Sequence, residues 1–62
     1  MTNGEIAMIV AQLVDTKNIK SGFVRNLAIV DVMKQKFDMD AMSINGADVF
    51  AQSEKILDEW YK

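Results

Sequence analysis

The chain contains no cysteine and no histidine, and these two absences limit what its 62 residues can fold into. A domain of this size buries only about 60% of the surface that its unfolded chain exposes, so small folds usually depend on disulfides, a structural metal or a partner subunit. Without cysteine there are no disulfides or thiolate ligands, and without histidine the commonest zinc ligand is missing. Helix packing and self-association are the remaining sources of stability.

The composition is that of a folded domain, because half of the residues are hydrophobic and 26% are charged. The apolar stretch over residues 6–14 contains Gln12, is far shorter than the roughly 20 residues of a membrane span, and lacks the basic leader of a signal peptide. We therefore expect a cytoplasmic protein without a membrane partner. Nucleic acids are bound by basic surfaces, so the net charge of −2 argues against a nucleic-acid partner.

Start signals divide the chain into three helices. Thr2 and Glu5 have the spacing of a capping box, in which the hydroxyl and the carboxylate bind the first free amides of a helix. Ser21 and Asn45 are the corresponding signals for two later helices. We therefore predict an all-α fold, a small three-helix bundle in a single domain of residues 1–62. The helices are expected near residues 3–16, 21–37 and 45–61.

The first and third helices each have one apolar face with the 3.6-residue period. In the first helix this face comprises Ile6, Ile9, Val10, Leu13 and Val14. In the third helix it comprises Val49, Phe50, Ser53, Ile56, Leu57 and Trp60. Such stripes are typical of surface helices that bury one side, so both faces are expected in the core.

The middle segment is apolar on more than one side. At 100° per residue one face comprises Phe23, Leu27, Val30, Met33 and Phe37, and we expect this face to close the core. A second face comprises Val24, Ala28 and Val32, while Ile29 points elsewhere. A helix of this kind is either central in the fold or in contact with another chain, so we expect it to be the most buried of the three. Its β-branched residues also permit a strand over residues 27–33, although strict alternation is missing.

The second apolar face predicts a surface for another protein chain. Each valine or isoleucine left in water forgoes roughly 1.5–3 kcal/mol, and a symmetric homodimer hides such residues simply because one patch serves both subunits. The predicted interface comprises Val24, Arg25, Ala28, Ile29, Val32 and Lys36. In the alternative, which the sequence leaves open, the middle helix lies between the other two and these residues are core.

Charge is distributed unevenly along the chain. Five basic residues and one acidic residue lie between positions 17 and 36, whereas six acidic and two basic residues lie between positions 37 and 62. The simpler interpretation is that the second and third helices attract each other. The other is a basic patch for a polyanion, with phosphate contacts from Lys17, Lys20, Arg25, Lys34 and Lys36.

No constellation of residues supports catalysis. A serine nucleophile needs a nearby base, and there is no histidine to supply one. The residues from Asp38 begin like a calcium loop, but Met42 and Ser43 stand where a ligand and a glycine are required. We therefore expect no enzymatic activity, cofactor, metal or small-molecule substrate.

The remaining class of function is a non-catalytic protein–protein interaction module. Examples are a small adaptor or an inhibitor of the kind that viruses and mobile elements encode. The alternative is a dimeric, helix-turn-helix-like transcriptional regulator that binds DNA through the basic residues of the middle segment.

Overall fold

The computed structural model describes residues 1–19 and 22–62, which form three α-helices and no strand. The helices are α1 (Asn3–Asp15), α2 (Phe23–Phe37) and α3 (Ile44–Trp60). Their ends agree with the expected ranges to within two residues, so the predicted all-helical architecture is confirmed. The alternative of a strand over residues 27–33 is wrong, because α2 continues through that segment.

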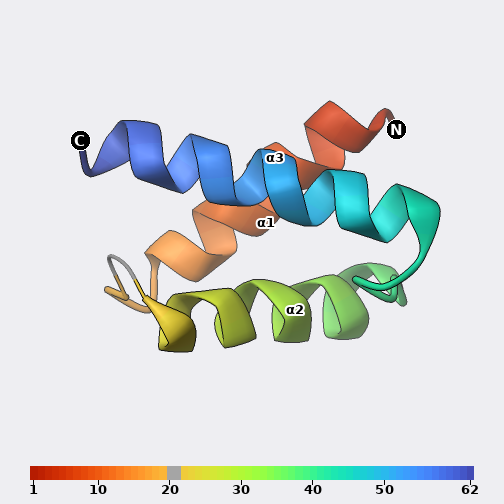
Figure 1. Ribbon diagram of the computed structural model, residues 1–62, viewed down its shortest axis with the longest axis horizontal. Coiled ribbons are helices and arrows are strands. Elements are labelled where there is room, and N and C mark those ends of the chain that lie inside the picture. Colours follow the sequence, from red (N-terminus) through yellow and green to blue (C-terminus); the bar gives the residue numbers. More distant parts are fainter. Residues whose placement is uncertain (20–21) are drawn as a thin grey trace.

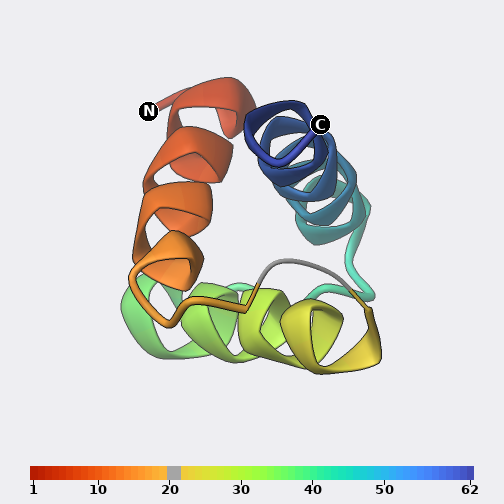
Figure 2. The ribbon, with the colours of Figure 1, turned by 90° about the vertical axis from the view of Figure 1, so that its left-hand side faces the viewer.

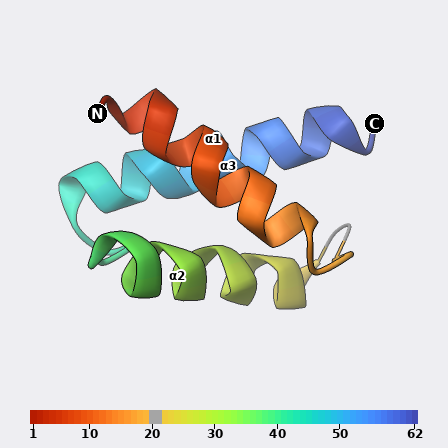
Figure 3. The same cartoon turned by 180° about the vertical axis from the view of Figure 1, so that it is seen from behind.

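The three helices enclose a triangular cross-section (Figure 2). α1 crosses α3 obliquely, and α2 runs along the open side of that pair (Figures 1 and 3). The contact between α1 and α3 is the most extensive, and α2 touches each of them over a smaller area. One long side of α2 therefore faces away from the rest of the chain.

The capping box at the start of α1 is present as predicted. The Glu5 amide donates to Thr2 Oγ1 at 3.1 Å, and the Thr2 amide donates to Glu5 Oε1 at 2.8 Å. The hydrogen bond from the Thr2 backbone, followed by that from its side chain, lowers the pKa of Glu5. A lowered pKa means that this cap stabilises the fold while Glu5 is ionised and weakens as the pH falls through that pKa.

The other two helix starts differ from the expectation. Ser21 lies outside the described residues, and α2 begins after Gly22, which has a positive φ of 89° and provides no side-chain cap. The cap of α3 is Ser43 and not Asn45: the Ser43 hydroxyl accepts from the Gly46 amide at 3.0 Å and donates to the Asp40 carbonyl at 2.7 Å. The cap therefore lies two residues before the expected one and the helix begins one residue early, because this serine joins it to the preceding turn.

The core is formed by apolar side chains from all three helices. Its buried hydrophobic members are Ala7, Val10, Ala11, Val14, Ala28, Ile29, Val32, Met33, Val49 and Leu57. Ser53 is also fully buried and donates to the Ala7 carbonyl at 3.3 Å, so its hydroxyl has a partner. The apolar stripes predicted for α1 and α3 thus face inward. Trp60 is the exception, because it lies beyond Leu57 and is 43% exposed.

α2 turns the opposite face inward from the one predicted. Its buried residues are Arg25, Ala28, Ile29, Val32 and Met33. Its exposed apolar residues are Phe23 (75%), Val24 (60%), Leu27 (51%) and Val30 (39%). The expectation that Phe23, Leu27 and Val30 close the core is therefore wrong, and only Met33 and the half-buried Phe37 of that face pack inward. Nor is α2 the most buried helix, since eight of its 15 residues are exposed, against three of the 13 residues of α1.

Gly46 should tolerate no side chain. A Cβ at this position would lie 1.8 Å from the Asp40 carbonyl oxygen and 2.7 Å from Ser43 Oγ, so the turn before α3 would have to move. We expect Gly46→Ala to lower the free energy of unfolding by about 1–3 kcal/mol, the usual range for overpacking. Urea denaturation followed by circular dichroism measures this.

Gly4→Ala is the matched control, because its Cβ would meet only Gln52 Oε1 at 3.4 Å and the Thr2 hydroxyl at 3.8 Å. Alanine is the better helix former, so Gly4→Ala should be neutral or stabilising by about 0.5–1 kcal/mol. Equal effects of the two substitutions would contradict the close approach of the turn to α3.

Candidate protein-interaction surface

The exposed apolar residues of α2 lie on one side of the helix. We call Phe23, Val24, Leu27 and Val30 the α2 outer face. Phe23, Leu27 and Val30 are spaced by four and three residues, which places them within about 60° of one another around the helix axis. The buried residues of α2 are centred roughly opposite, so the outer face points directly away from the core.

The residues predicted to form an interface are divided between the core and the surface. Ala28, Ile29 and Val32 are buried in the core, where no partner can reach them. Only Val24 and Lys36 are exposed. The alternative left open by the sequence, in which the second apolar face of the middle segment is core, is therefore the arrangement that the structure has.

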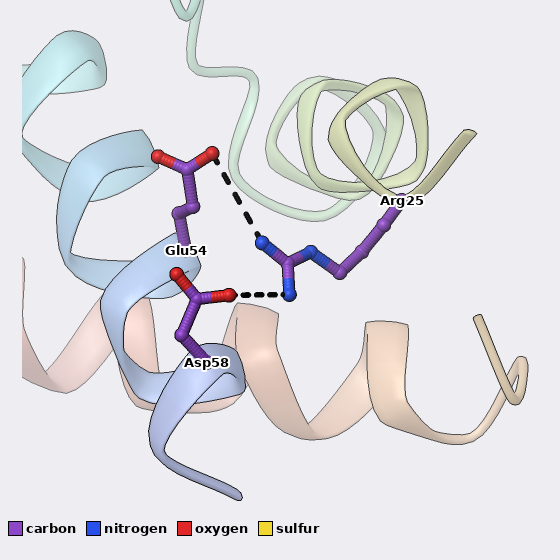
Figure 4. A network of polar contacts seen from close by, with 3 residues as sticks. All are labelled: Arg25, Glu54 and Asp58. Atoms are coloured by element: carbon purple, nitrogen blue, oxygen red, sulfur yellow. Dashed lines mark hydrogen bonds and ion pairs between the residues drawn. The ribbon is translucent and has the colours of Figure 1, made fainter. Parts of the chain in front are cut away.

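Arg25, the remaining member of the predicted interface, is 4% exposed and points from α2 toward α3 (Figure 4). Its Nη1 donates to Asp58 Oδ1 at 2.8 Å, and its Nη2 lies 4.0 Å from Glu54 Oε2. A buried guanidinium must be paired with anions, and α3 supplies two from successive turns. This contact realises the predicted attraction between the basic middle segment and the acidic third helix.

The basic residues do not form one patch. Lys20 lies outside the described residues, and Arg25 is occupied by the acids of α3. Lys17 lies in the connection between α1 and α2, whereas Lys34 and Lys36 lie in the last turn of α2 at the other end of that helix. The described part of the predicted phosphate-binding set is therefore split between distant positions.

Of the six large apolar residues exposed outside α2, Met42 and Ile44 are the most exposed. Met42 and Ile44 are almost fully exposed in the turn before α3 and at its first residue. At the other end of α3, the Tyr61 hydroxyl donates to the Asp15 carboxylate, and this hydrogen bond is the main reason that the pKa of Tyr61 is raised. The contact ties the end of α3 to the end of α1.

Among the described residues no pocket and no cluster of three potential metal-binding side chains is found. None of their helices combines the length and the apolar character required to cross a bilayer. The chain matches no protein-family model, and no curated protein or solved structure is significantly similar to it. The α2 outer face is thus the feature of the surface from which a function can be argued.

A signal for this face was present in the sequence. Phe23, Leu27, Val30, Lys34 and Phe37 alternate spacings of four and three residues. That alternation is the heptad pattern of a helix that packs against another helix along a straight seam. The lysine within it marks the seam as a surface, because a lysine amid a small core would lack a partner.

The opposite exposures of Val32 and Leu27 predict opposite effects of the same substitution. Val32→Glu places a charge in the core, which costs about 3–5 kcal/mol when the charge is unpaired. A chain of 62 residues has a total stability of about 3–9 kcal/mol, so this variant should lose a third or more of that stability. Leu27→Glu should retain its helical circular dichroism spectrum and cooperative unfolding. A Val32→Glu variant as stable as the Leu27→Glu variant in urea unfolding would contradict the observed orientation of α2.

The ion pair of Arg25 predicts that Asp58 stabilises the fold more than its neighbour Glu59 does. Asp58→Ala leaves the buried guanidinium with Glu54 at 4.0 Å, and we expect a loss of about 1–3 kcal/mol. Glu59 lies 3.9 Å from Lys62 with both side chains exposed, so Glu59→Ala should change stability by less than about 0.5 kcal/mol. Thermal and urea unfolding provide the comparison, and equal losses would show that Arg25 does not depend on Asp58.

Proposed function

We propose that this protein is a non-catalytic protein–protein interaction module that binds through the α2 outer face. The observation that carries the proposal is the exposure of Phe23, Val24, Leu27 and Val30 on one side of a helix whose other side is fully packed. Single exposed apolar residues are normal on protein surfaces, but a contiguous group with an aromatic residue is typical of a binding site.

The spacing of the outer face suits recognition by helix packing. Phe23, Leu27 and Val30 occupy positions i, i+4 and i+7, which are the anchor positions of a helix that docks on an apolar groove or on another helix. Aromatic residues are frequent energetic centres of such interfaces, and Phe23 is the most exposed residue of this face. A module of this kind acts by occupying the surface of its partner, as an adaptor or an inhibitor does.

Electrostatics favours a protein over a nucleic acid as the partner. Phosphate backbones are bound by gathered lysine and arginine side chains. The outer face contains no arginine, and its nearest lysine, Lys34, lies 3.3 Å from the Asp38 carboxylate. Arg25 is directed into the protein. The transcriptional regulator considered above therefore receives no support from a gathered basic surface.

The proposal is tested by affinity capture with matched variants. Immobilised wild-type, Leu27→Glu and Ile44→Glu proteins are incubated with extract of the organism that encodes the chain, and bound proteins are quantified by mass spectrometry. Ile44 is almost fully exposed and lies outside the outer face, so its variant controls for the added charge. We expect specific partners, which include the chain itself if it self-associates, to fall at least tenfold on Leu27→Glu and to be unchanged on Ile44→Glu.

The same variants distinguish the alternative function. Equal recovery on all three proteins would contradict binding through the outer face. Binding to random-sequence duplex DNA that weakens steeply with salt and is insensitive to Leu27→Glu would favour the DNA-binding regulator. Binding through an apolar face should instead respond little to salt.

A further inference from the structure

We propose that the partner of the α2 outer face is a second copy of this chain, with the two α2 helices packed antiparallel and Leu27 opposite Val30 of the second copy. This inference rests on the proposed function, since it names the partner for the same face. The spacing of the exposed residues and the position of Lys34 concern the pairing, and the size of the face concerns the strength of the dimer.

The spacing makes α2 complementary to itself. Phe23, Leu27, Val30, Lys34 and Phe37 follow the alternation of four and three residues that keeps a seam straight between two helices. The exposed members of this seam lie on the side of α2 opposite to the buried residues, so a second helix can approach without displacing α1 or α3. A two-fold axis through the middle of the seam uses the same patch on both subunits.

Lys34 selects the antiparallel orientation. In a parallel pair in register, the two Lys34 side chains would face each other within the seam, and like charges there are repulsive. In the antiparallel pair with Leu27 opposite Val30, the two Lys34 positions are about 16 Å apart along the axis, from a rise of 1.5 Å per residue. Each Lys34 then lies opposite Phe23 of the second copy.

The pairing of Lys34 with Phe23 is complementary in chemistry. Phe23 is 75% exposed, so its ring is open to a second chain. The aliphatic stem of a lysine covers apolar surface, and its ammonium group is attracted to the face of an aromatic ring. The contact of Lys34 with Asp38 joins two exposed side chains 3.3 Å apart and leaves the stem accessible. Antiparallel helices also bring opposite ends of their dipoles together.

The size of the face predicts a weak dimer. The seam occupies one side of a 15-residue helix, and a standard interface of about 800 Å² per subunit would cover about a fifth of the 4055 Å² surface of this chain. A single helix pair covers less than that. We therefore expect a dissociation constant in the range of about 1–100 µM, as for small and transient interfaces.

Sedimentation equilibrium between 5 and 500 µM tests the self-association. Wild-type and Ile44→Glu proteins should show a reversible monomer–dimer equilibrium with the same constant. Leu27→Glu should raise the dissociation constant more than tenfold, because a two-fold axis places two new charges near the centre of the interface. Circular dichroism of each variant establishes that the monomer is folded.

Cysteine cross-linking tests the orientation, and the chain has no cysteine of its own to interfere. Phe23→Cys and Lys34→Cys proteins are oxidised separately and as an equimolar mixture at 200 µM. The antiparallel pairing predicts a disulfide-linked dimer in the mixture that contains one chain of each variant. A dimer formed mainly by Phe23→Cys alone, or by Lys34→Cys alone, would overturn the antiparallel pairing.

The outcomes separate this inference from the proposed function. A chain that stays monomeric at 500 µM, or a dimer that is insensitive to Leu27→Glu, overturns the inference. If the chain is monomeric but loses a foreign partner on Leu27→Glu, the interaction module stands and the second copy is excluded as its partner. If neither self-association nor capture depends on Leu27, both proposals fail.

Discussion

The character of the surface depends on the orientation of α2, which buries Ile29 and Met33 and directs Arg25 to Asp58 of α3. The guanidinium is almost completely buried and binds Asp58 at 2.8 Å, with Glu54 at 4.0 Å. Rotating α2 by half a turn would bring Phe23 and Leu27 into the core, but it would move Arg25 away from both acids. The ion pair therefore accompanies the observed face and adds to the packing of α2, while its acids stay partly in solvent, with 39% of the Glu54 and 63% of the Asp58 side chain exposed.

The chain buries one apolar side of α2, which includes the large Ile29 and Met33, and exposes the other. Ala28 and Val32 face the core, whereas Phe23 and Leu27 face away from it. The facing helices are suited to this arrangement because α1 contributes two alanines and α3 contributes the buried Ser53. Close packing of the inner side against these two helices leaves the outer side of α2 outside the core.

Polar contacts hold the two ends of the bundle, and these contacts do not involve the side of α2 that is buried. At one end Ser43 joins the turn before α3 to the helix, and Gly46 allows that turn to approach closely. At the other end Tyr61 binds Asp15. These contacts fix the lengths and the connections of the helices while the α2 outer face stays available to a second chain.

The sequence by itself determined the three helices, because the spacing of apolar residues and the residues that cap a helix are local properties of the chain. The box of Thr2 and Glu5 and the stripe through Val49 and Leu57 were predictable for this reason. It did not determine which face of α2 is buried, since Phe23, Leu27 and Val30 are as apolar as the residues that entered the core. Only the tertiary structure decided that, because the surfaces that pack against α2 and the acids that pair with Arg25 come from residues distant in the sequence. Which apolar side of α2 is exposed depended on the same choice, so three of the residues that the sequence predicted for an interface, Ala28, Ile29 and Val32, lie in the core.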